Sequence, residues 1–541
     1  MLKEKSLFWA DQFAAKVVNR EEILQRGIKN LRVESGLGAS GIPHIGSFGD
    51  VMRAYAVKLA LEDIGKKSEL IAYSDDRDGL RKVPSGFDSS LEKFIGMPVT
   101  SIPDPFKCHS SYGGHMSSIL IDAMERVGVE YTFKSATDVY KSGALDEQIG
   151  KILADYKKIG QIIREAVGQE KFVDAYPYYP VCEKCGRIYT TRVTEVLEKE
   201  KKVRYVCDQE FKGKNQITGN PVIIAGCGHE GEVSYSKAGG KLAWKVEFAA
   251  RWDALKIVFE AIGKDIRDSV AINDIISKEI LLFDPPIHMM YELFLESGGK
   301  KISKSVGNVF TAQDWLRYGS KKSLALLMFK RATGTRELSP EDIPKYMNEV
   351  DELDRVYFNE KKLTNEKDAM QSKRLYEFVN FMKPKKEPTL RINYEILANL
   401  TKILPIKQDD KIKVIAELLE QTGHIDKANK ELAERIVYAT NWISVMKDEI
   451  KPTKIDLNAK EGAALTEFAN KLAKGMGSDA AQSLAFETAK KNGIETAKFF
   501  KILYVAILGI ERGPKIGKLT SILGEDHTAK LIREYAANNY M

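Results

Sequence analysis

The first hundred residues combine a short extended run, a helical pattern and a second short run. Residues 30–34 have an extended pattern and residues 35–43 are loop-like. Apolar residues then recur at helical spacing up to Gly65, which favours a helix end; they are Phe48, Val51, Met52, Tyr55 and Leu59. Residues 70–73 are apolar enough for a buried parallel strand. The pattern therefore predicts a βαβ unit over residues 30–73.

A second α/β pattern appears much later in the chain. It covers residues 255–259 and 287–295, so we expect two halves of one Rossmann-like parallel sheet with an insertion between them. After about residue 311, apolar residues follow at three- and four-residue spacing through residue 541. This spacing predicts an all-α C-terminal region.

Composition narrows the class of protein more than it identifies a function. A chain of 541 residues should form roughly two to four domains, and it is 43% hydrophobic and 29% charged. No apolar stretch approaches the length of a membrane span, and residues 1–9 lack the apolar run of a signal peptide. We therefore expect a soluble, cytoplasmic protein with no membrane partner. The formal charge of +7 permits a nucleic-acid partner without indicating one.

Two short motifs carry candidate chemistry. Pro43, His44, Ile45 and Gly46 lie between the first strand and its helix, where backbone N–H groups and the helix dipole form a natural phosphate site. Residues 300–308 read as a lysine-bearing loop that can close over a polyphosphate. Each motif alone could be structural, as a helix-start histidine or a solvated basic turn. Both together, one in each half of the sheet, favour a shared catalytic role.

These motifs resemble those of class I aminoacyl-tRNA synthetases: residues 43–46 resemble their HIGH motif and residues 301–305 (KISKS) their KMSKS motif. The resemblance implies a catalytic domain that forms an aminoacyl adenylate from ATP with Mg²⁺ and passes the acyl group to the 3′-terminal adenosine of tRNA. It implies catalytic roles for His44, Lys301 and Lys304. The implied ATP-binding residues are Pro43, His44, Gly46, Gly263, Asp265, Lys301, Ser303 and Lys304. Ser47 departs from the fourth HIGH position.

Glu34 bears on the choice of amino acid. Glutamyl-tRNA synthetases carry an arginine ten residues before the HIGH histidine, where this chain has Glu34, and such a swap would invert the charge preference of the pocket. The arrangement resembles class I lysyl-tRNA synthetases of the archaeal type, and the likeness continues in residues 74–84, 241–252 and 263–265. It implies a lysine pocket formed by Glu34, Gly36, Trp244 and Tyr291. Gly38 and Ile266 depart from the family pattern, which commonly has threonine and histidine there.

Four of the five cysteines lie within residues 182–227 of the expected insertion. Cys182 and Cys185 form a CxxC pair, and Cys207, Cys227 and His229 follow, so the segment predicts a structural Zn²⁺ site. Spacing leaves open whether Cys207 or His229 supplies the fourth ligand. Cys108, His109 and His115 suggest a second metal site, but we interpret them as unrelated loop residues.

The expected function is ligation of lysine to tRNA(Lys), with ATP and L-lysine as the other substrates. We expect residues 1–100 and 241–325 to form the halves of the catalytic domain, the latter with the KISKS loop, and 101–240 to be the zinc-bearing insertion. Residues 326–400 should be a helical stem-contact region and 401–541 an all-α anticodon-binding domain; a monomer is the expected state. The alternatives are another class I synthetase (glutamyl, glutaminyl or arginyl), a tRNA-free nucleotidyltransferase and a non-catalytic RNA-binding paralogue.

Overall fold

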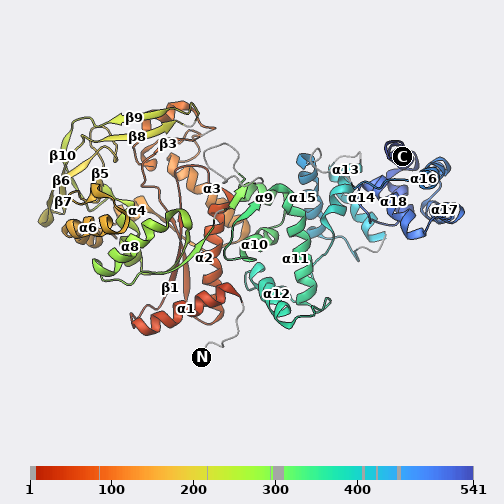
Figure 1. The fold of residues 1–541 in the computed structure, drawn as a ribbon, viewed down its shortest axis with the longest axis horizontal. Helices are drawn as coiled ribbons and strands as arrows, with labels where there is room; N and C mark the ends of the chain where they lie inside the picture. Colours follow the sequence, from red (N-terminus) through yellow and green to blue (C-terminus); the bar gives the residue numbers. More distant parts are fainter. Residues whose placement is uncertain are drawn as a thin grey trace. The chain divides into compact units, whose positions relative to one another are not determined.

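The computed structural model describes residues 8–84, 86–215, 217–292, 294–296, 310–404, 408–421, 425–446 and 453–539. The chain divides into two compact units (Figure 1). The first comprises Met1–Gln313, Ala325–Ser339 and Asn365–Pro384, and the second comprises Asp314–Leu324, Pro340–Thr364 and Lys385–Met541. The expected five-segment division of the chain stays a prediction.

The first unit contains a five-stranded parallel sheet in the order β13-β12-β1-β2-β4. Its strands are β1 (Leu31–Leu37), β2 (Ser68–Ser74), β4 (Thr132–Ser135), β12 (Ile257–Gly263) and β13 (Ile287–Tyr291). The N-terminal half supplies β1, β2 and β4, and the later half supplies β12 and β13. The expectation of one sheet built from two separated halves is therefore confirmed.

Helix α2 (Ile45–Asp63) links β1 to β2 and completes the predicted βαβ unit. Its side chains are buried along most of its length because it packs against β1, β2 and β12. β1 runs further than predicted, to Leu37, since Ser35, Gly36 and Leu37 continue the parallel pairing with β2. The later part of the predicted second α/β pattern, residues 287–295, contains β13 and the start of the short β14 (Phe294–Glu296).

The insertion between the halves contains both helices and small sheets (Figure 1). Helix α3 (Tyr112–Val127) precedes β4 and belongs to the N-terminal half, and the helices that follow β4 are α4 (Ala136–Lys141), α5 (Asp146–Ala154) and α6 (Tyr156–Val167). The strands of the insertion are β5 (Tyr178–Pro180), β6 (Arg192–Leu197), β7 (Lys202–Val206), β8 (Glu210–Asn215), β9 (Pro221–Ala225), β10 (Glu230–Ser234) and β11 (Gly240–Leu242), and β8 also pairs with the short β3 (Lys82–Val83) of the N-terminal half. They form the sheets β10-β7-β6, β3-β8-β9 and β11-β5.

Two helices frame the later half of the sheet: α7 (Trp244–Leu255) precedes β12, and α8 (Arg267–Glu279) follows it. A hydrophobic core between the sheet and these helices includes Tyr73, Trp252 and Ile262. Helix α1 (Trp9–Leu24) packs against α2.

In the described residues after 311 the chain is mainly helical, as predicted, and the short strand β15 (Arg336–Leu338), which pairs with β14, departs from this pattern. Its helices are α9 (Ala312–Tyr318), α10 (Lys321–Phe329), α11 (Ile343–Tyr357), α12 (Glu366–Val379), α13 (Tyr394–Ile403), α14 (Gln408–Gln421), α15 (Lys430–Met446), α16 (Ala459–Lys471), α17 (Ser478–Lys491), α18 (Thr496–Leu508), α19 (Ile516–Leu523) and α20 (Glu525–Asn538). None of the helices in the described ranges is long and apolar enough to cross a membrane.

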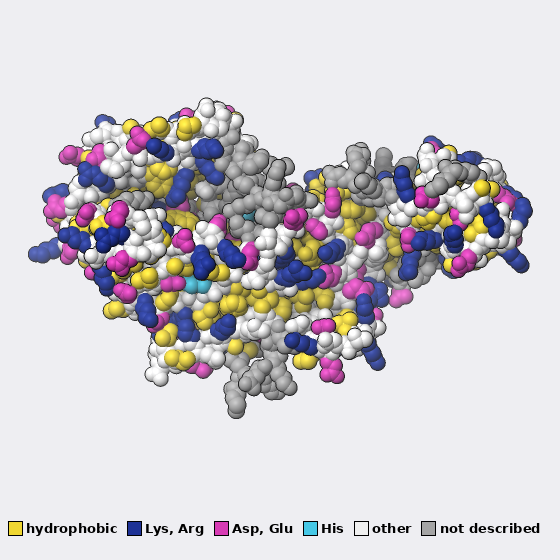
Figure 2. All heavy atoms as spheres, viewed as in Figure 1, with side chains coloured by type: hydrophobic (Ala, Val, Ile, Leu, Met, Phe, Trp, Pro, Cys, Tyr) yellow, Lys and Arg dark blue, Asp and Glu magenta, His cyan; other side chains and the backbone are white. Residues whose placement is uncertain are grey.

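Basic and acidic side chains are interspersed over the face drawn in Figure 2. Neither sign of charge collects there into one large patch. The net positive charge of the sequence therefore does not by itself indicate a binding surface on this face.

Candidate active site

A pocket of about 380 Å³ lies at the carboxyl ends of β1, β12 and β13, where ligands bind in open parallel sheets. Six residues expected to bind ATP or lysine line it: Gly36, His44, Trp244, Gly263, Asp265 and Tyr291. Gly38 and Ile266, which depart from the family pattern, also line it. Lys301, Ser303 and Lys304 of the expected lysine loop lie outside the described residues.

His44 is the residue that begins helix α2 as its N-cap. Its backbone is extended, with φ −93° and ψ 172°, and its ring Nδ1 accepts the backbone N–H of Ser47 at 3.3 Å. Because Nδ1 acts as acceptor, a neutral imidazole here carries its proton on Nε2. The ring therefore stands beside the positive end of the helix dipole, which is a suitable place for phosphate.

Gly46 is required by the position of the His44 ring. A Cβ at residue 46 would lie 2.7 Å from both Cε1 and Nδ1 of His44, which is closer than any normal contact. The family resemblance implied that this glycine binds ATP. In the structure its missing side chain makes room for the capping imidazole, and neither Gly46 nor Pro43 is among the residues that line the pocket.

Arg251 lies at the centre of a buried group of carboxylates below the pocket. Its Nε lies 2.6 Å from Glu34 Oε1, its Nη1 3.2 Å from Asp75 Oδ1 and its Nη2 3.0 Å from Glu260 Oε1. The rings of Tyr73 and Phe248 lie 4.5 and 4.6 Å from the guanidinium carbon. Burial alone would lower the pKa of Arg251, but the three carboxylates raise it above its ordinary value.

Glu34 is placed differently from the sequence expectation. Its side chain is 0% exposed, it faces Arg251, and it is not among the residues that line the pocket. Asp75 and Glu260, on the other sides of the same guanidinium, do line the pocket. The negative charge expected at the strand end is present, but it forms an ion pair with an arginine inside the protein. The carboxylates that reach the pocket come from neighbouring strands.

The carboxylate of Asp78 is held by two donors. Lys241 Nζ lies 2.9 Å from Asp78 Oδ1, and Trp244 Nε1 donates to Asp78 Oδ2 at 3.0 Å. Lys241 also pairs with the buried Glu247. Trp244 packs edge to face on Phe248, with the ring centroids 5.2 Å apart. Trp244 therefore forms an apolar wall whose orientation is fixed by its indole N–H.

Tyr291, at the end of β13, is also held by neighbours. Its hydroxyl donates to Asp50, and the Arg53 guanidinium lies 4.0 Å from the ring centroid. Burial raises the pKa of Tyr291 well above its ordinary value. Because Arg53 occupies a face of the ring, Tyr291 is better suited to shape the pocket than to provide a new cation–π contact.

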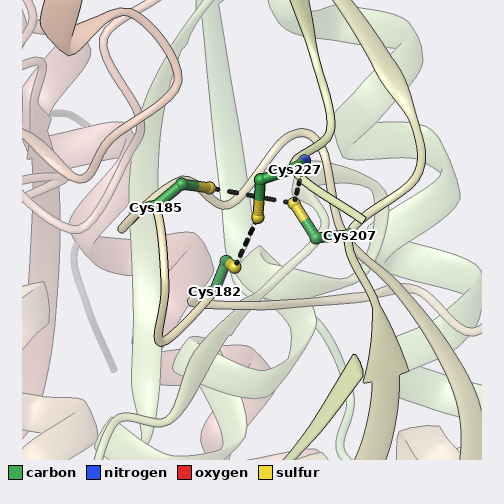
Figure 3. A group of neighbouring side chains, drawn as sticks. All are labelled: Cys182, Cys185, Cys207 and Cys227. Carbon is green, nitrogen blue, oxygen red and sulfur yellow. Dashed lines mark hydrogen bonds between the residues drawn. The ribbon is translucent and has the colours of Figure 1, made fainter. Parts of the chain in front are cut away.

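The four clustered cysteines converge in the insertion (Figure 3). The Sγ atoms of Cys182, Cys185, Cys207 and Cys227 all lie within 4.8 Å of one another. The shortest S–S separations are 3.6 Å for Cys182 with Cys227 and 3.8 Å for Cys185 with Cys207, far beyond a disulfide bond. Four sulfur atoms in this arrangement could bind a tetrahedral metal ion.

The alternative ligand, His229, lies outside this group of sulfur atoms. Its Nε2 lies 3.9 Å from Glu183 Oε2, while its backbone carbonyl accepts the N–H of Cys207 at 2.8 Å. The structure thus brings Cys207 to the candidate metal site and gives His229 a backbone role beside it. Cys207 and His229 both have suitable spacing and chemistry for the fourth ligand, so only their positions in the fold distinguish them.

A second group of potential metal ligands corrects the sequence interpretation of Cys108, His109 and His115 as unrelated. With Asp104 they place four ligand atoms within 4.8 Å of one another. The Nδ1 atoms of both histidines lie 3.2 Å from Cys108 Sγ and 3.2 Å from each other. Asp104 accepts the backbone N–H groups of Phe106, Cys108 and His109, and these bonds hold the pKa of its carboxyl well below its usual range despite the opposing effect of desolvation.

Three residues of these sites, Asp75, Asp104 and Arg251, were not expected from the sequence. Asp75 and Arg251 lay within blocks read as family resemblance, and nothing in the sequence showed that they would meet Glu34. The spacing of Asp104 to Cys108, His109 and His115 is the sequence signal that could have identified it as a potential metal ligand.

The sequence is similar to known proteins over nearly its whole length. The family described as tRNA synthetases class I (K) matches residues 7–382, and an anticodon binding domain matches residues 373–536. A relative from Cenarchaeum symbiosum named lysine–tRNA ligase is 45% identical and is aligned over 97% of this chain and 98% of its own length. A relative of the same name from Rickettsia bellii (strain OSU 85-389) is 32% identical and is aligned over 93% of this chain and 92% of its own length. Another, from Haloarcula marismortui, is 30% identical and is aligned over 98% of this chain and 96% of its own length.

The family match spans the parallel sheet, the pocket and both groups of potential metal ligands, and the helical remainder matches the anticodon binding domain. The expected fold class is thereby confirmed: a synthetase catalytic domain with a cysteine-bearing insertion, followed by a helical anticodon-binding domain. The chain belongs to the class I tRNA synthetases of the (K) family.

Proposed function

We propose that this enzyme ligates lysine to tRNA(Lys). The lysine carboxylate attacks the α-phosphate of ATP, forming lysyl-adenylate as pyrophosphate leaves. The 3′-terminal ribose hydroxyl of tRNA then takes the lysyl group, and AMP is released. The observation that supports lysine most directly is the name shared by relatives that align over nearly the whole chain. The chemistry needs positioning and electrostatic stabilisation, with no covalent nucleophile from the protein.

Asp75 is the proposed partner of the lysine ε-ammonium. It lines the pocket, whereas Glu34 does not. Lys241 is shared by Asp78 and Glu247, whereas Asp75 shares the single guanidinium of Arg251 with two other carboxylates. The larger excess of carboxylates over paired cations therefore lies around Arg251. A cationic side chain is favoured there and a substrate carboxylate is repelled.

ATP is proposed to lie across the other side of the pocket. His44 and the N-terminus of α2 would face its phosphates, and Gly263 and Asp265 would lie toward its ribose. Lys301, Ser303 and Lys304 keep the role implied by the family resemblance. Mg²⁺ would accompany the nucleotide and neutralise charge on its phosphates.

ATP–pyrophosphate exchange against all twenty amino acids, with and without tRNA, tests this assignment. We expect exchange with lysine alone. Exchange with glutamate or glutamine would contradict the charge argument, and exchange with arginine would retain the argument but overturn the lysine assignment. Exchange without transfer to any tRNA would favour the nucleotidyltransferase alternative.

A second cleft, of about 590 Å³, is the proposed route of the unpaired 3′ end of tRNA. It shares Asp78 and Trp244 with the active-site pocket. Aromatic and basic side chains line it, including Tyr176, Tyr179, Tyr189, Phe211, Arg81 and Lys245. Aromatic faces that stack on bases, beside cations that follow the phosphates, are typical of single-strand binding.

Phe211→Ala tests this route. Loss of one stacking contact, worth about 1–3 kcal/mol, should raise KM for tRNA roughly tenfold and leave pyrophosphate exchange unchanged. Val222→Ala, on the partner strand β9, is a control for disturbance of the small sheet. An unchanged KM for tRNA in Phe211→Ala would contradict the route.

The helical region that matches the anticodon binding domain is proposed to bind the anticodon arm of tRNA(Lys). A tRNA transcript with an altered anticodon should then be charged less efficiently, while pyrophosphate exchange without tRNA stays the same. Equal charging of both transcripts would count against this role.

The four-cysteine cluster is proposed to hold a structural Zn²⁺ through Cys182, Cys185, Cys207 and Cys227. Four thiolates leave no open position for catalysis. Asp104, Cys108, His109 and His115 are proposed to form a second metal site, because two imidazole Nδ1 atoms and a thiol converge on one carboxylate. Metal analysis of chelator-free protein should find two ions per chain; one ion would remove the second site.

A further inference from the structure

Lys82 lines the active-site pocket, and none of the roles implied by the family resemblance falls on it. In the part of the chain that the structure describes, it is the only lysine or arginine among the residues that line this pocket. Five carboxylates line the same pocket: Asp50, Asp75, Asp78, Glu260 and Asp265. The first step of the proposed reaction brings a carboxylate against a polyphosphate. A pocket lined in this way needs a cation at the point where the two anions meet.

Other cations lie in the walls around the pocket, but they face other partners. Arg251 pairs with three carboxylates, and Lys241 pairs with two. Arg53 lies over the ring of Tyr291, and Arg77 donates to two backbone carbonyls at the end of the insertion. The pocket lining includes none of these four cations. Among the described residues, the basic side chain that reaches the pocket itself is therefore that of Lys82.

The backbone of Lys82 is fixed by its neighbours in the chain and in the small sheet. Leu80 and Val83 are both buried in one hydrophobic cluster, and Lys82 pairs in register with Lys214 of β8. Consecutive residues of an extended chain point to opposite sides. Accordingly, Arg81 lines the second cleft, whereas Lys82 lines the active-site pocket. The two consecutive cations therefore face different hollows.

The same hydrophobic cluster places Lys82 between the proposed positions of the two substrates. The cluster includes Ala39, which lies in the loop between β1 and His44 and also lines the pocket. This loop leads to the N-terminus of α2, where the ATP phosphates are proposed to lie. The segment of Lys82 follows the carboxyl end of β2, on the side proposed for lysine. Because both segments pack in one cluster, Lys82 lies near the junction of amino acid and phosphate.

We propose that Lys82 binds the reacting carboxylate of lysine and holds it against the α-phosphate of ATP. One carboxylate oxygen attacks the α-phosphorus, the bond from phosphorus to the bridging oxygen breaks, and pyrophosphate leaves with the bonding electrons. The Lys82 ammonium gives up no proton. It reduces the repulsion between the two anions before the attack and stays beside the oxygens of lysyl-adenylate afterwards. This inference rests on the proposed function, because it takes lysine and ATP as the substrates.

Comparison of L-lysine with L-lysinamide tests this contact, because lysinamide replaces the carboxylate by a neutral amide of similar shape. Competition binding to the full chain, with a non-hydrolysable ATP analogue present, gives both dissociation constants. The unmodified enzyme should bind lysine roughly ten- to hundredfold more tightly than lysinamide, as expected for a hydrogen bond between two charged groups. Equal affinity for the two ligands in the unmodified enzyme would overturn the inference without any variant.

Two substitutions at Lys82 and one on the neighbouring strand complete the test. Lys82→Met keeps the aliphatic stem but removes the charge, so it should bind lysine and lysinamide almost equally. Its kcat/KM for lysine in pyrophosphate exchange should fall roughly 10²-fold. Lys82→Arg retains the charge and should keep the preference for lysine. Lys214→Met removes a charge from the exposed position paired with Lys82, outside the pocket, and should change neither measurement.

The affinity ratio separates a substrate contact from a structural role. If Lys82→Met loses affinity for both ligands by the same factor, or keeps the full preference for lysine, the inference is wrong. Pyrophosphate exchange by the unmodified enzyme distinguishes this failure from failure of the proposed function. Exchange with lysine together with an unaltered preference in Lys82→Met overturns the inference alone, whereas no exchange with lysine, with or without tRNA, overturns the proposed function.

Discussion

The four-cysteine cluster and the active-site pocket both assemble residues that are distant in sequence, but they do so by different chemistry. In the cluster, four side chains of one kind converge, and four such thiols are the ligands that a tetrahedral metal ion would need. In the pocket, the carboxylates of Asp75, Asp78 and Glu260 are already paired with cations of the protein, so the role of each depends on the charge that remains uncompensated. Residue type therefore indicates the function of the cluster, whereas the pocket can be interpreted only from its contacts.

The largest expected effect concerns the cluster. Cys182→Ser should lose the metal ion and destabilise the insertion, because structural zinc sites supply about 10–16 kcal/mol of apparent binding free energy in small domains. Metal analysis and thermal unfolding measure the two effects. The matched variant is His229→Ala, which leaves all four thiols in place and should retain the ion. Loss of metal from His229→Ala alone would reverse the assignment of the fourth ligand.

In the pocket, the same kind of comparison separates two carboxylates that share Arg251. Asp75→Asn should reduce kcat/KM for lysine by roughly 10²-fold, since losing one partner of a buried charge pair typically costs about 2–5 kcal/mol. Glu34→Gln should reduce it less than about fivefold, because Glu34 does not line the pocket and an amide keeps the shape of the carboxyl beside Arg251. Pyrophosphate exchange at varied lysine concentration gives both values. A larger loss in Glu34→Gln would restore the sequence-based role of Glu34.

A smaller effect is expected at the start of α2. Gly46→Ala should displace the His44 ring, and overpacking of this kind costs about 1–3 kcal/mol, which we expect as a roughly tenfold lower rate of adenylate formation. His44→Asn is the informative companion, because asparagine also caps helices. It should keep the stability of the protein while lowering the rate. If both variants form adenylate at the unmodified rate, the His44 ring has no part in the reaction.

The smallest effect on activity is expected at the second group of metal ligands. Asp104→Asn should lower the metal content from two ions to one, while lysine activation changes by less than about twofold, as is usual away from the reacting groups. Metal analysis and pyrophosphate exchange on one preparation provide the test. Unchanged metal content would show that these four side chains do not bind an ion.

The sequence predicted the parts of the fold that depend on local pattern. The helix after Phe48, the strand over residues 70–73 and the helical C-terminal region follow from spacing of apolar residues, and all are present. The extra residues of β1, by contrast, depend on pairing with β2. Gly36, His44 and Trp244 line the pocket. His44 was expected there from its local motif, and Gly36 and Trp244 were expected from the family resemblance.

The partner of Glu34 could not be predicted in the same way. Arg251 is more than two hundred residues away in sequence, and no periodicity links the two positions. A single charge read from the sequence suggested a substrate contact, but its meaning depended on which cation folds against it. The same limit applied to Asp104. It can be recognised as a potential metal ligand only in the folded loop, where both histidines lie beside Cys108.

The position of β1 between β2 and β12 has a consequence during synthesis of the protein. Glu34 pairs in register with Glu260, so one edge of β1 stays uncovered until the ribosome has made the whole insertion and β12. At about 10 residues per second this interval lasts roughly 20 s. A nascent chain in this interval presents an unpaired apolar strand edge, which makes it a substrate for chaperones and a site of premature aggregation.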